Sequence, residues 1–208
     1  RTRHQDVYRA GGGSHADYLA RAHGPWGRRL RRLSPRHALL LAIERRVFSD
    51  PRQLIQCNSA MVREQIAARY DVPAERLVVI ANGVDLERFH PGRRAGADRV
   101  REATATPTGP AWLFVGSGFS RKGLDVALRA LALAGGEGTL WVAGRDAAGP
   151  WRRRAEALGV APRVRFLGPR NDLPDPYAAA AALLLPPRYD ASATVCPDAL
   201  PPGLPVVP

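Results

Sequence analysis

The second half of the chain alternates between short apolar runs and segments with helical spacing of apolar residues. The expected strands span residues 111–115, 139–143, 164–167, 183–185 and 204–207, and the expected helices span residues 122–133, 151–158 and 175–182. Short apolar runs of this kind are typical of strands that are buried on both faces. Their alternation with helices predicts a parallel, doubly wound sheet.

The first half has a weaker pattern of the same kind. The expected strands span residues 54–57 and 77–80, and the expected helices span residues 17–23, 35–48 and 59–70. Ser34-Pro35 has the residue types of a helix start, and Asp50-Pro51 those of a helix end. Residues 93–110 have no apolar period and are interpreted as a linker, so the predicted domains are residues 1–92 and 111–208.

Charge and cysteine content limit the classes of function. The 208 residues include 31 basic and 19 acidic side chains, for a formal charge of +12. This excess favours phosphorylated ligands, anionic lipid or nucleic acid as partners. Two cysteines, Cys57 and Cys196, exclude a disulfide scaffold and fit a reducing cytoplasm. The apolar runs are too short for a membrane-spanning helix.

A glycine-rich turn follows the first strand of the second half. It reads Gly116-Ser117-Gly118-Phe119-Ser120-Arg121-Lys122-Gly123, and Lys122 is the only lysine of the chain. Glycines let a ligand approach the backbone, and the next helix is expected to offer free N–H groups and a partial positive charge. With Arg121 and Lys122 this predicts a cradle for a diphosphate. The alternative is an ordinary turn with two solvated cations.

The sequence lacks the motifs of dinucleotide, P-loop and metal sites. The turn matches neither the G-x-G-x-x-G dinucleotide fingerprint nor the P-loop. The chain has no D-x-D pair, and its five histidines lack the spacing of metal ligands. We therefore expect neither a metal nor a cofactor.

Several segments resemble a known family. Residues 70–91 and 115–123, then Phe166-Leu167-Gly168, Asn171-Asp172-Leu173, Leu183-Leu184-Leu185-Pro186 and Gly203-Leu204-Pro205-Val206-Val207, are similar to retaining GT-B glycosyltransferases of the family-4 type. The resemblance implies an α/β GT-B fold with two Rossmann-like, doubly wound parallel-sheet domains, both incomplete in this chain. It implies a fragment that lacks an N-terminal and a C-terminal portion and has little or no activity alone.

The segment Gln5–His15 and the basic region after it resemble the lipopolysaccharide core α-1,3-glucosyltransferase branch. That branch implies metal-independent transfer of glucose from UDP-glucose, with retention, to a lipid-linked glycan acceptor. It further implies a bacterial protein on the cytoplasmic face of the inner membrane, with no nucleic-acid partner.

Site residues follow from the same resemblance. Arg121 and Lys122, with Gly116, Ser117 and Gly118, are expected to bind the donor and stabilise the leaving diphosphate. Asp198 is expected to hold the ribose and Asp190 the donor sugar, at positions where the family has two glutamates. Prolines at 197, 201 and 202 predict a shortened helix there. His15 has either a catalytic or acceptor-side role or is a solvated loop histidine.

A basic stretch with interspersed apolar residues spans residues 21–48. We expect a membrane contact through Trp26, Arg28, Arg29, Arg31 and Arg32. The alternative is a helix packed on the core.

At the level of function, the alternative to a glycosyltransferase is a non-catalytic basic module that binds anionic lipid or nucleic acid.

Overall fold

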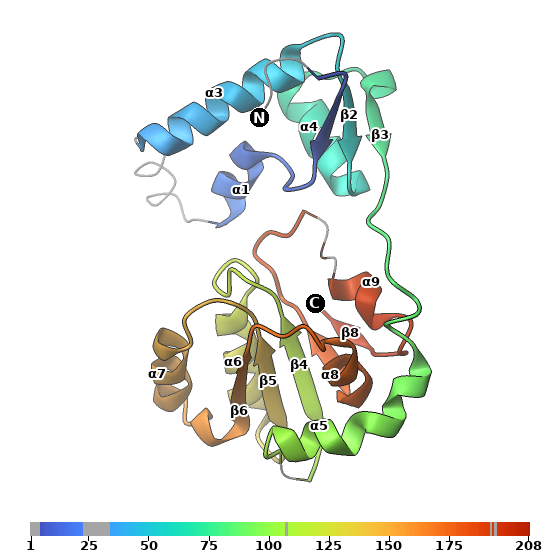
Figure 1. Ribbon diagram of the computed structural model, residues 1–208. Helices are drawn as coiled ribbons and strands as arrows, with labels where there is room; N and C mark the ends of the chain where they lie inside the picture. Colours follow the sequence, from blue (N-terminus) through green and yellow to red (C-terminus); the bar gives the residue numbers. More distant parts are fainter. Residues whose placement is uncertain (1–4, 23–33, 107, 192, 194) are drawn as a thin grey trace. The chain divides into compact units, whose positions relative to one another are not determined.

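The computed structural model describes residues 5–22, 34–106, 108–191, 193 and 195–208. The chain forms two compact units (Figure 1). The first comprises Arg1–Asn82 together with Tyr189–Ser192, and the second comprises Gly83–Arg188 and Ala193–Pro208. The division follows Asn82 and lies before the predicted boundary at residue 92. A short segment of the predicted second domain also belongs to the first unit.

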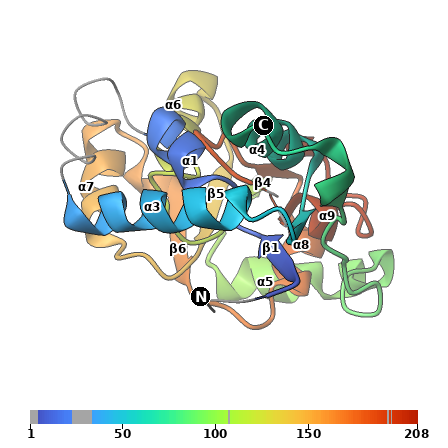
Figure 2. The same ribbon diagram turned by 90° about the horizontal axis from the view of Figure 1, so that it is seen from above.

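The first unit contains a parallel, three-stranded sheet with helices against it. Its strands are β1 (Val7–Ala10), β2 (Leu54–Cys57) and β3 (Leu77–Val79), in the order β1-β2-β3. Its helices are α1 (His15–Ala22), α3 (Pro35–Ser49), α4 (Ala60–Tyr70) and the 3-10 turn η1 (Ala74–Arg76). Strand β1 was not predicted, because Val7-Tyr8-Arg9-Ala10 is too short and mixed to show an apolar run. Helix α1 lies beside α3 in Figure 2.

Helices α3 and α4 cover one face of this sheet. Their buried residues Val47, Phe48, Val62 and Ile66 pack with Ile55 of β2 in one core. The sequence offers Asn58 or Ser59 as the cap of helix α4, and in the structure it is Ser59, whose hydroxyl accepts a hydrogen bond from the Val62 N–H at 3.3 Å. The predicted ends of α3 are also confirmed, with Pro35 as its first residue and Asp50 as its C-cap.

The opposite face of the three-stranded sheet carries exposed apolar residues beside two polar ones, Arg9 and Gln56. Val7 lies opposite Leu54 across the β1–β2 pair, and Gln56 lies opposite Val78 across the β2–β3 pair. Val7, Leu54 and Val78 are 56%, 45% and 44% exposed.

A buried carboxylate, Glu44 of α3, ties the three helices of this unit together. It accepts hydrogen bonds from the Ser14 hydroxyl at 3.1 Å, from the Ala16 N–H at 3.2 Å, and from the His15 N–H and the Tyr70 hydroxyl. Two of these donors are the first amides of α1, which have no partner within the helix. Glu44 therefore caps α1 and fixes it against α3 and α4.

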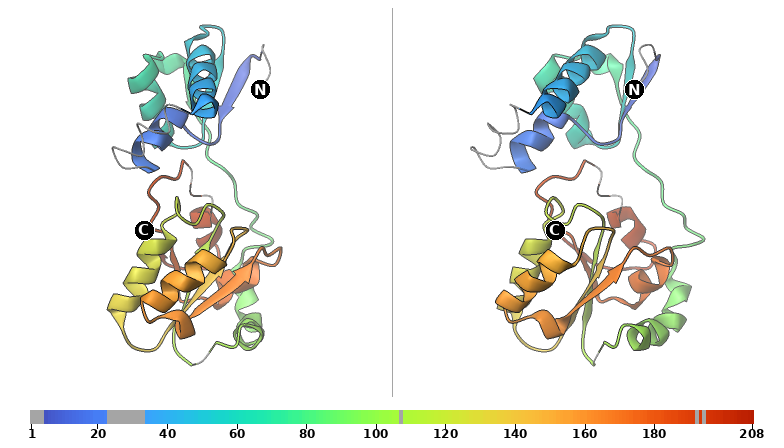
Figure 3. Two further views of the ribbon diagram at one scale, coloured as in Figure 1. Left: turned by 90° about the vertical axis from the view of Figure 1, so that its left-hand side faces the viewer. Right: turned by 60° about the vertical axis from the view of Figure 1, so that its left-hand side comes forward.

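The second unit contains a parallel, five-stranded sheet in the order β6-β5-β4-β7-β8. The strands are β4 (Ala111–Val115), β5 (Thr139–Ala143), β6 (Val164–Gly168), β7 (Ala182–Leu184) and β8 (Val206–Val207). The helices are η2 (Pro91–Gly96), α5 (Ala97–Ala103), α6 (Leu124–Ala134), α7 (Gly149–Ala157), η3 (Ala161–Arg163), α8 (Pro174–Ala179) and α9 (Val195–Ala199). Helices α6 and α7 lie on one face of the sheet and α8 on the other (Figures 1 and 3), which confirms the doubly wound α/β fold.

The region predicted as a linker is different in the structure. Residues 93–110 contain most of η2 and all of α5, and both elements pack against α8. Arg93 forms an ion pair with Asp175 of α8 at 2.7 Å, and Val100 is part of the second core. The sequence pattern missed α5 because so short a helix shows only one buried apolar residue.

We expect Glu44→Gln to lower the free energy of unfolding of this chain by about 2–3 kcal/mol, because the new amide NH2 would face buried N–H and O–H donors. Urea unfolding measures this loss. The matched control is Glu64→Gln on the exposed face of α4, which should stay within about 0.5 kcal/mol of the parent. Equal stability of the two variants would contradict the role of Glu44.

Candidate functional site

The glycine-rich turn lies at the topological switch point of the five-stranded sheet. Strand β4 pairs with β5 on one side and with β7 on the other. From β4 the chain continues on one side of the sheet, through β5 and β6, and it then crosses to the other side of β4 to form β7. The loops after β4 and β7 therefore leave adjacent strands in opposite directions. Ligands of doubly wound sheets bind in such a crevice. The loops 116–123 and 185–188 meet here.

Two glycines of the turn are required by its geometry. Gly116 has a φ of 133°, and a Cβ added to it would lie 2.4 Å from Cε of Lys122. Gly123 has a φ of 81°, and its added Cβ would lie 1.7 Å from the carbonyl oxygen of Pro186. Any larger residue at 116 would displace the lysine, and any larger residue at 123 would separate the loops after β4 and β7.

Lys122 is buried although it carries a charge. The residue is only 7% exposed, and its N–H donates to the Gly118 carbonyl at 2.9 Å. Lysine is rarely so buried. Arg121 is the neighbouring cation, and its guanidinium reaches the Ser117 carbonyl at 3.5 Å. The structure thus places all five predicted donor-loop residues on one turn at the switch point.

An acidic residue that the sequence analysis missed holds this turn. The Asp146 carboxylate accepts the N–H groups of Gly118 and Phe119, each at 2.8 Å. The adjacent Arg145 N–H donates to the Ser117 hydroxyl at 3.3 Å. Asp146 follows β5 at the same edge of the sheet, and this position was the one sequence signal that could have pointed to it.

Several backbone amides of the predicted anion cradle have partners within the chain. The Gly118 and Phe119 amides hold a carboxylate of the chain itself. At the start of α6, the Leu124 N–H donates to the Phe119 carbonyl at 3.0 Å, and the N–H groups of Val126 and Ala127 donate to the Gly123 carbonyl. Helix α6 also begins at Leu124, two residues after the predicted start. The amides of Gly118, Phe119 and Leu124 are therefore already engaged within the chain, and the side chains of Arg121 and Lys122 are the cations of this turn.

The two predicted aspartates lie in different units. Asp198 is on α9 of the second unit, whereas Asp190 belongs to the Tyr189–Ser192 segment of the first. Helix α9 ends at Ala199, before Pro201, so its predicted shortening is confirmed. Burial raises the pKa of the Asp198 carboxyl, and this outweighs the opposing effect of Arg88.

His15 is not in a loop, contrary to the expectation, because it is the first residue of α1. Its Nε2 lies 3.0 Å from Nδ1 of His37, and the two rings stack with centroids 5.1 Å apart. The sequence analysis did not single out His37. A helical histidine with a ring partner is more restricted than a solvated loop histidine.

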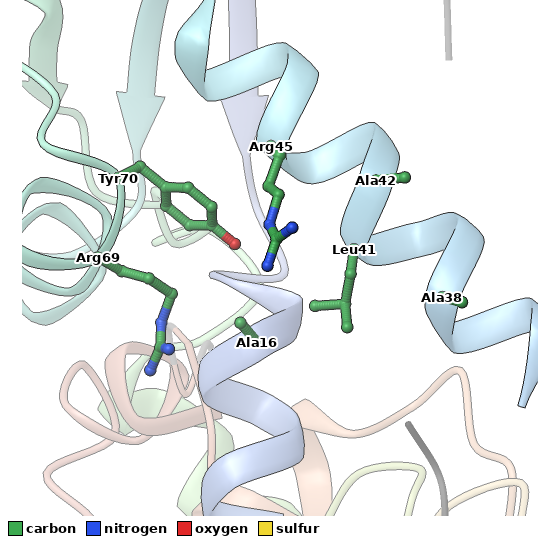
Figure 4. A pocket seen from close by; sticks show the side chains of 7 residues that line it. All are labelled: Ala16, Ala38, Leu41, Ala42, Arg45, Arg69 and Tyr70. Carbon is green, nitrogen blue, oxygen red and sulfur yellow. The ribbon is translucent and has the colours of Figure 1, made fainter. Parts of the chain in front are cut away.

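Next to this histidine pair, a pocket of about 690 Å³ opens between α1, α3 and α4 (Figure 4). Its lining is apolar apart from two guanidinium groups and a phenol, and consists of Ala16, Ala38, Leu41, Ala42, Arg45, Arg69 and Tyr70. Arg69 is held in place by Asp17, with N–O distances of 2.8 and 2.6 Å. The volume and mixed lining fit a small amphiphilic group.

The predicted membrane-contact residues Trp26, Arg28, Arg29, Arg31 and Arg32 lie outside the described residues. Among the helices that are described, none is both long enough and apolar enough to cross a bilayer.

Because the raised pKa of Asp198 reflects a folded state that disfavours the charged carboxylate, Asp198→Asn should increase stability at neutral pH. The gain should shrink as the pH falls through the raised pKa, since the native carboxyl then takes up its proton and the parent chain becomes more stable. Urea unfolding across this pH range tests the expectation. Asp98→Asn on exposed α5 is the control and should give no such gain; a pH-independent difference for Asp198→Asn would contradict the assignment.

Two family models match the chain. Residues 7–88 match Glycosyltransferase Family 4, and residues 109–208 match Glycosyl transferases group 1. Lipopolysaccharide glucosyltransferase WaaG of Escherichia coli K12 is 29% identical over 97% of this chain and 55% of its own length. D-inositol 3-phosphate glycosyltransferase of Mycolicibacterium smegmatis is 31% identical over 84% of this chain and 41% of its own length.

Solved structures of glycosyltransferases resemble the fold of this chain. The crystal structure of WaaG superposes with a TM-score of 0.85 at 29% identity, over 98% of this chain and 56% of that chain. Anabaena HepE, solved in complex with UDP and glucose, shares the fold with a TM-score of 0.71 at 21% identity, over 97% of this chain and 58% of that chain. The chain spans about half the length of these relatives. With both parts of the chain matched by glycosyltransferase models, it belongs to the glycosyltransferases with the GT-B fold.

Proposed function

We propose that the protein transfers glucose from UDP-glucose, with retention, to a lipopolysaccharide core or a similar membrane-held glycan. The observation that carries this proposal is the buried lysine of the switch-point turn. Lys122 and Arg121 supply two cations at the place where doubly wound sheets bind nucleotides. WaaG, at 29% identity over nearly the whole chain, supports the choice of donor and acceptor.

In this proposal the chain itself supplies the charge that the reaction needs. Breaking the sugar–phosphate bond leaves negative charge on the departing diphosphate. Lys122 and Arg121, held by the turn before that charge develops, stabilise it electrostatically. Because two cations meet this need, the proposed reaction uses no metal. Asp198 would hold the ribose hydroxyls and Asp190 the donor sugar.

The acceptor is proposed to bind to the first unit. The pocket of Figure 4 combines an apolar lining with Arg45, Arg69 and Tyr70, which suits part of an amphiphilic, anionic acceptor. His15 and His37 directly precede the pocket residues Ala16 and Ala38. The basic residues before α3 would contact the anionic inner face of the inner membrane.

We expect Lys122→Ala to weaken UDP binding about tenfold to a hundredfold, because a charge-assisted contact to phosphate contributes roughly 1.5–3 kcal/mol. Isothermal titration of this chain with UDP measures the change. The matched control is Arg153→Ala on exposed α7, which removes the same charge away from the turn. Equal affinities for both variants, with binding abolished by salt, would instead favour a basic module without donor specificity.

The membrane contact is tested by replacing Arg28, Arg29, Arg31 and Arg32 with Gln. Each basic residue near an anionic bilayer contributes about 1 kcal/mol, and salt screens the attraction. Sedimentation with phosphatidylglycerol-containing vesicles should therefore fall strongly. A control variant has the same net charge, with Gln at Arg63, Arg152, Arg153 and Arg154, and should sediment like the parent. If the two variants sediment equally, net charge alone drives binding.

A further inference from the structure

Arg188, at the carboxyl end of β7, contacts the donor turn through both its backbone and its side chain. Its N–H donates to the Arg121 carbonyl at 2.9 Å. Its Nη1 donates to the Ser120 carbonyl at 2.6 Å. Arg188 therefore joins the loop after β7 to the two residues that directly precede Lys122.

The second arm of the guanidinium is anchored on a buried carboxylate. Nη2 of Arg188 lies 2.6 Å from Oδ2 of Asp125, in the first turn of α6. Burial alone would raise the pKa of Asp125, but the Arg188 and Arg129 guanidinium groups lower it below its ordinary value. Asp125 is thus a charged anchor, and the rigid fork of Arg188 bridges it to the Ser120 carbonyl.

We propose that Arg188 is a positioning residue for the donor diphosphate, which sets the backbone of Ser120 and Arg121 and so the placement of Arg121 and Lys122. This rests on the proposed function, in which those two cations bind the diphosphate. Asp146 holds the other end of the turn through the amides of Gly118 and Phe119, whereas Arg188 contacts the carbonyls of Ser120 and Arg121. Without Arg188, ordering residues 120–122 would be a cost of ligand binding.

The chain offers a matched control for this role. Arg129, one turn further along α6, donates to the same Asp125 Oδ2 at 3.0 Å, and among the described residues it otherwise donates only to the Asp125 carbonyl. Arg129→Gln and Arg188→Gln each remove one guanidinium from Asp125, but only Arg188→Gln releases the turn. A purely structural role for the cluster would lower the melting temperature in both variants and change UDP affinity in neither.

We expect Arg188→Gln to weaken UDP binding about fivefold to tenfold in isothermal titration, and Arg129→Gln to leave it within about twofold. Arg188→Lys, which keeps the charge but loses the fork, should recover only part of the affinity. Amide hydrogen exchange at Lys122 and Leu124, measured without ligand, should accelerate in Arg188→Gln and not in Arg129→Gln. Equal effects of the two glutamine variants in either measurement would overturn the proposal.

Asp125→Asn separates positioning from direct phosphate binding by Arg188. If Arg188 positions the turn, Asp125→Asn also weakens UDP binding, and the double variant with Arg188→Gln is no weaker than Arg188→Gln alone. If Arg188 bound phosphate directly, Asp125→Asn would release its guanidinium and maintain or tighten UDP binding, which would overturn the proposal. Lys122→Ala is the reference variant. If Lys122→Ala binds UDP as the parent does, the donor site itself is refuted. If Lys122→Ala loses UDP affinity but Arg188→Gln does not, only the positioning role of Arg188 is refuted.

Discussion

The parallel pairing of β4 with β7 is the constraint on which the candidate site depends. It brings the loops that follow these strands to one point, although more than half of the second unit separates them along the chain. Gly123 then packs on the Pro186 carbonyl, at a distance that no side chain allows. The Arg121 carbonyl accepts a hydrogen bond from the Arg188 N–H across the same contact. The cations of the turn owe their location to this junction rather than to local sequence alone.

Acidic and basic side chains around this junction have different roles. Carboxylates of the chain, Asp146 and Asp125, take up the amides and guanidinium groups that hold the turn in shape. Lys122 and Arg121 are the cations of the turn to which we assign the donor diphosphate in the proposed function. The strong excess of arginine in the composition therefore says little about the site, because several arginines serve as structural donors to carbonyls and buried acids.

The sequence predicted the elements whose signal is local. Strands β2, β4, β5 and β6 stand out as apolar runs, and Ser59 and Pro35 mark helix starts by their own chemistry. The donor turn was found because its glycines and its lysine are adjacent in sequence. Strand β1 and helix α5 were missed because neither is long enough to show a period.

Residues that support the site or the helices from a distance were missed for another reason. Glu44, Asp146 and Arg188 each act on groups 26 or more positions away in the chain, and a single charged residue in one sequence carries no sign of such a partner. The resemblance to a known family supplied the turn and the two aspartates, but only the structure showed that Asp190 belongs to the other unit and that His15 begins a helix.

The Tyr189–Ser192 segment has a consequence for the order in which the protein folds. Within the first unit, the Ala191 carbonyl accepts the Ser59 hydroxyl at 2.8 Å across 132 positions, and Tyr189 contacts Gln65 across 124. On the ribosome, β1 to β3 and their helices emerge long before this segment exists. The first unit must therefore wait, incomplete, while nearly the whole second unit is synthesised. Contacts between residues so far apart in the sequence slow folding. During synthesis, the first unit can therefore complete its fold only after residues 189–192 have been translated.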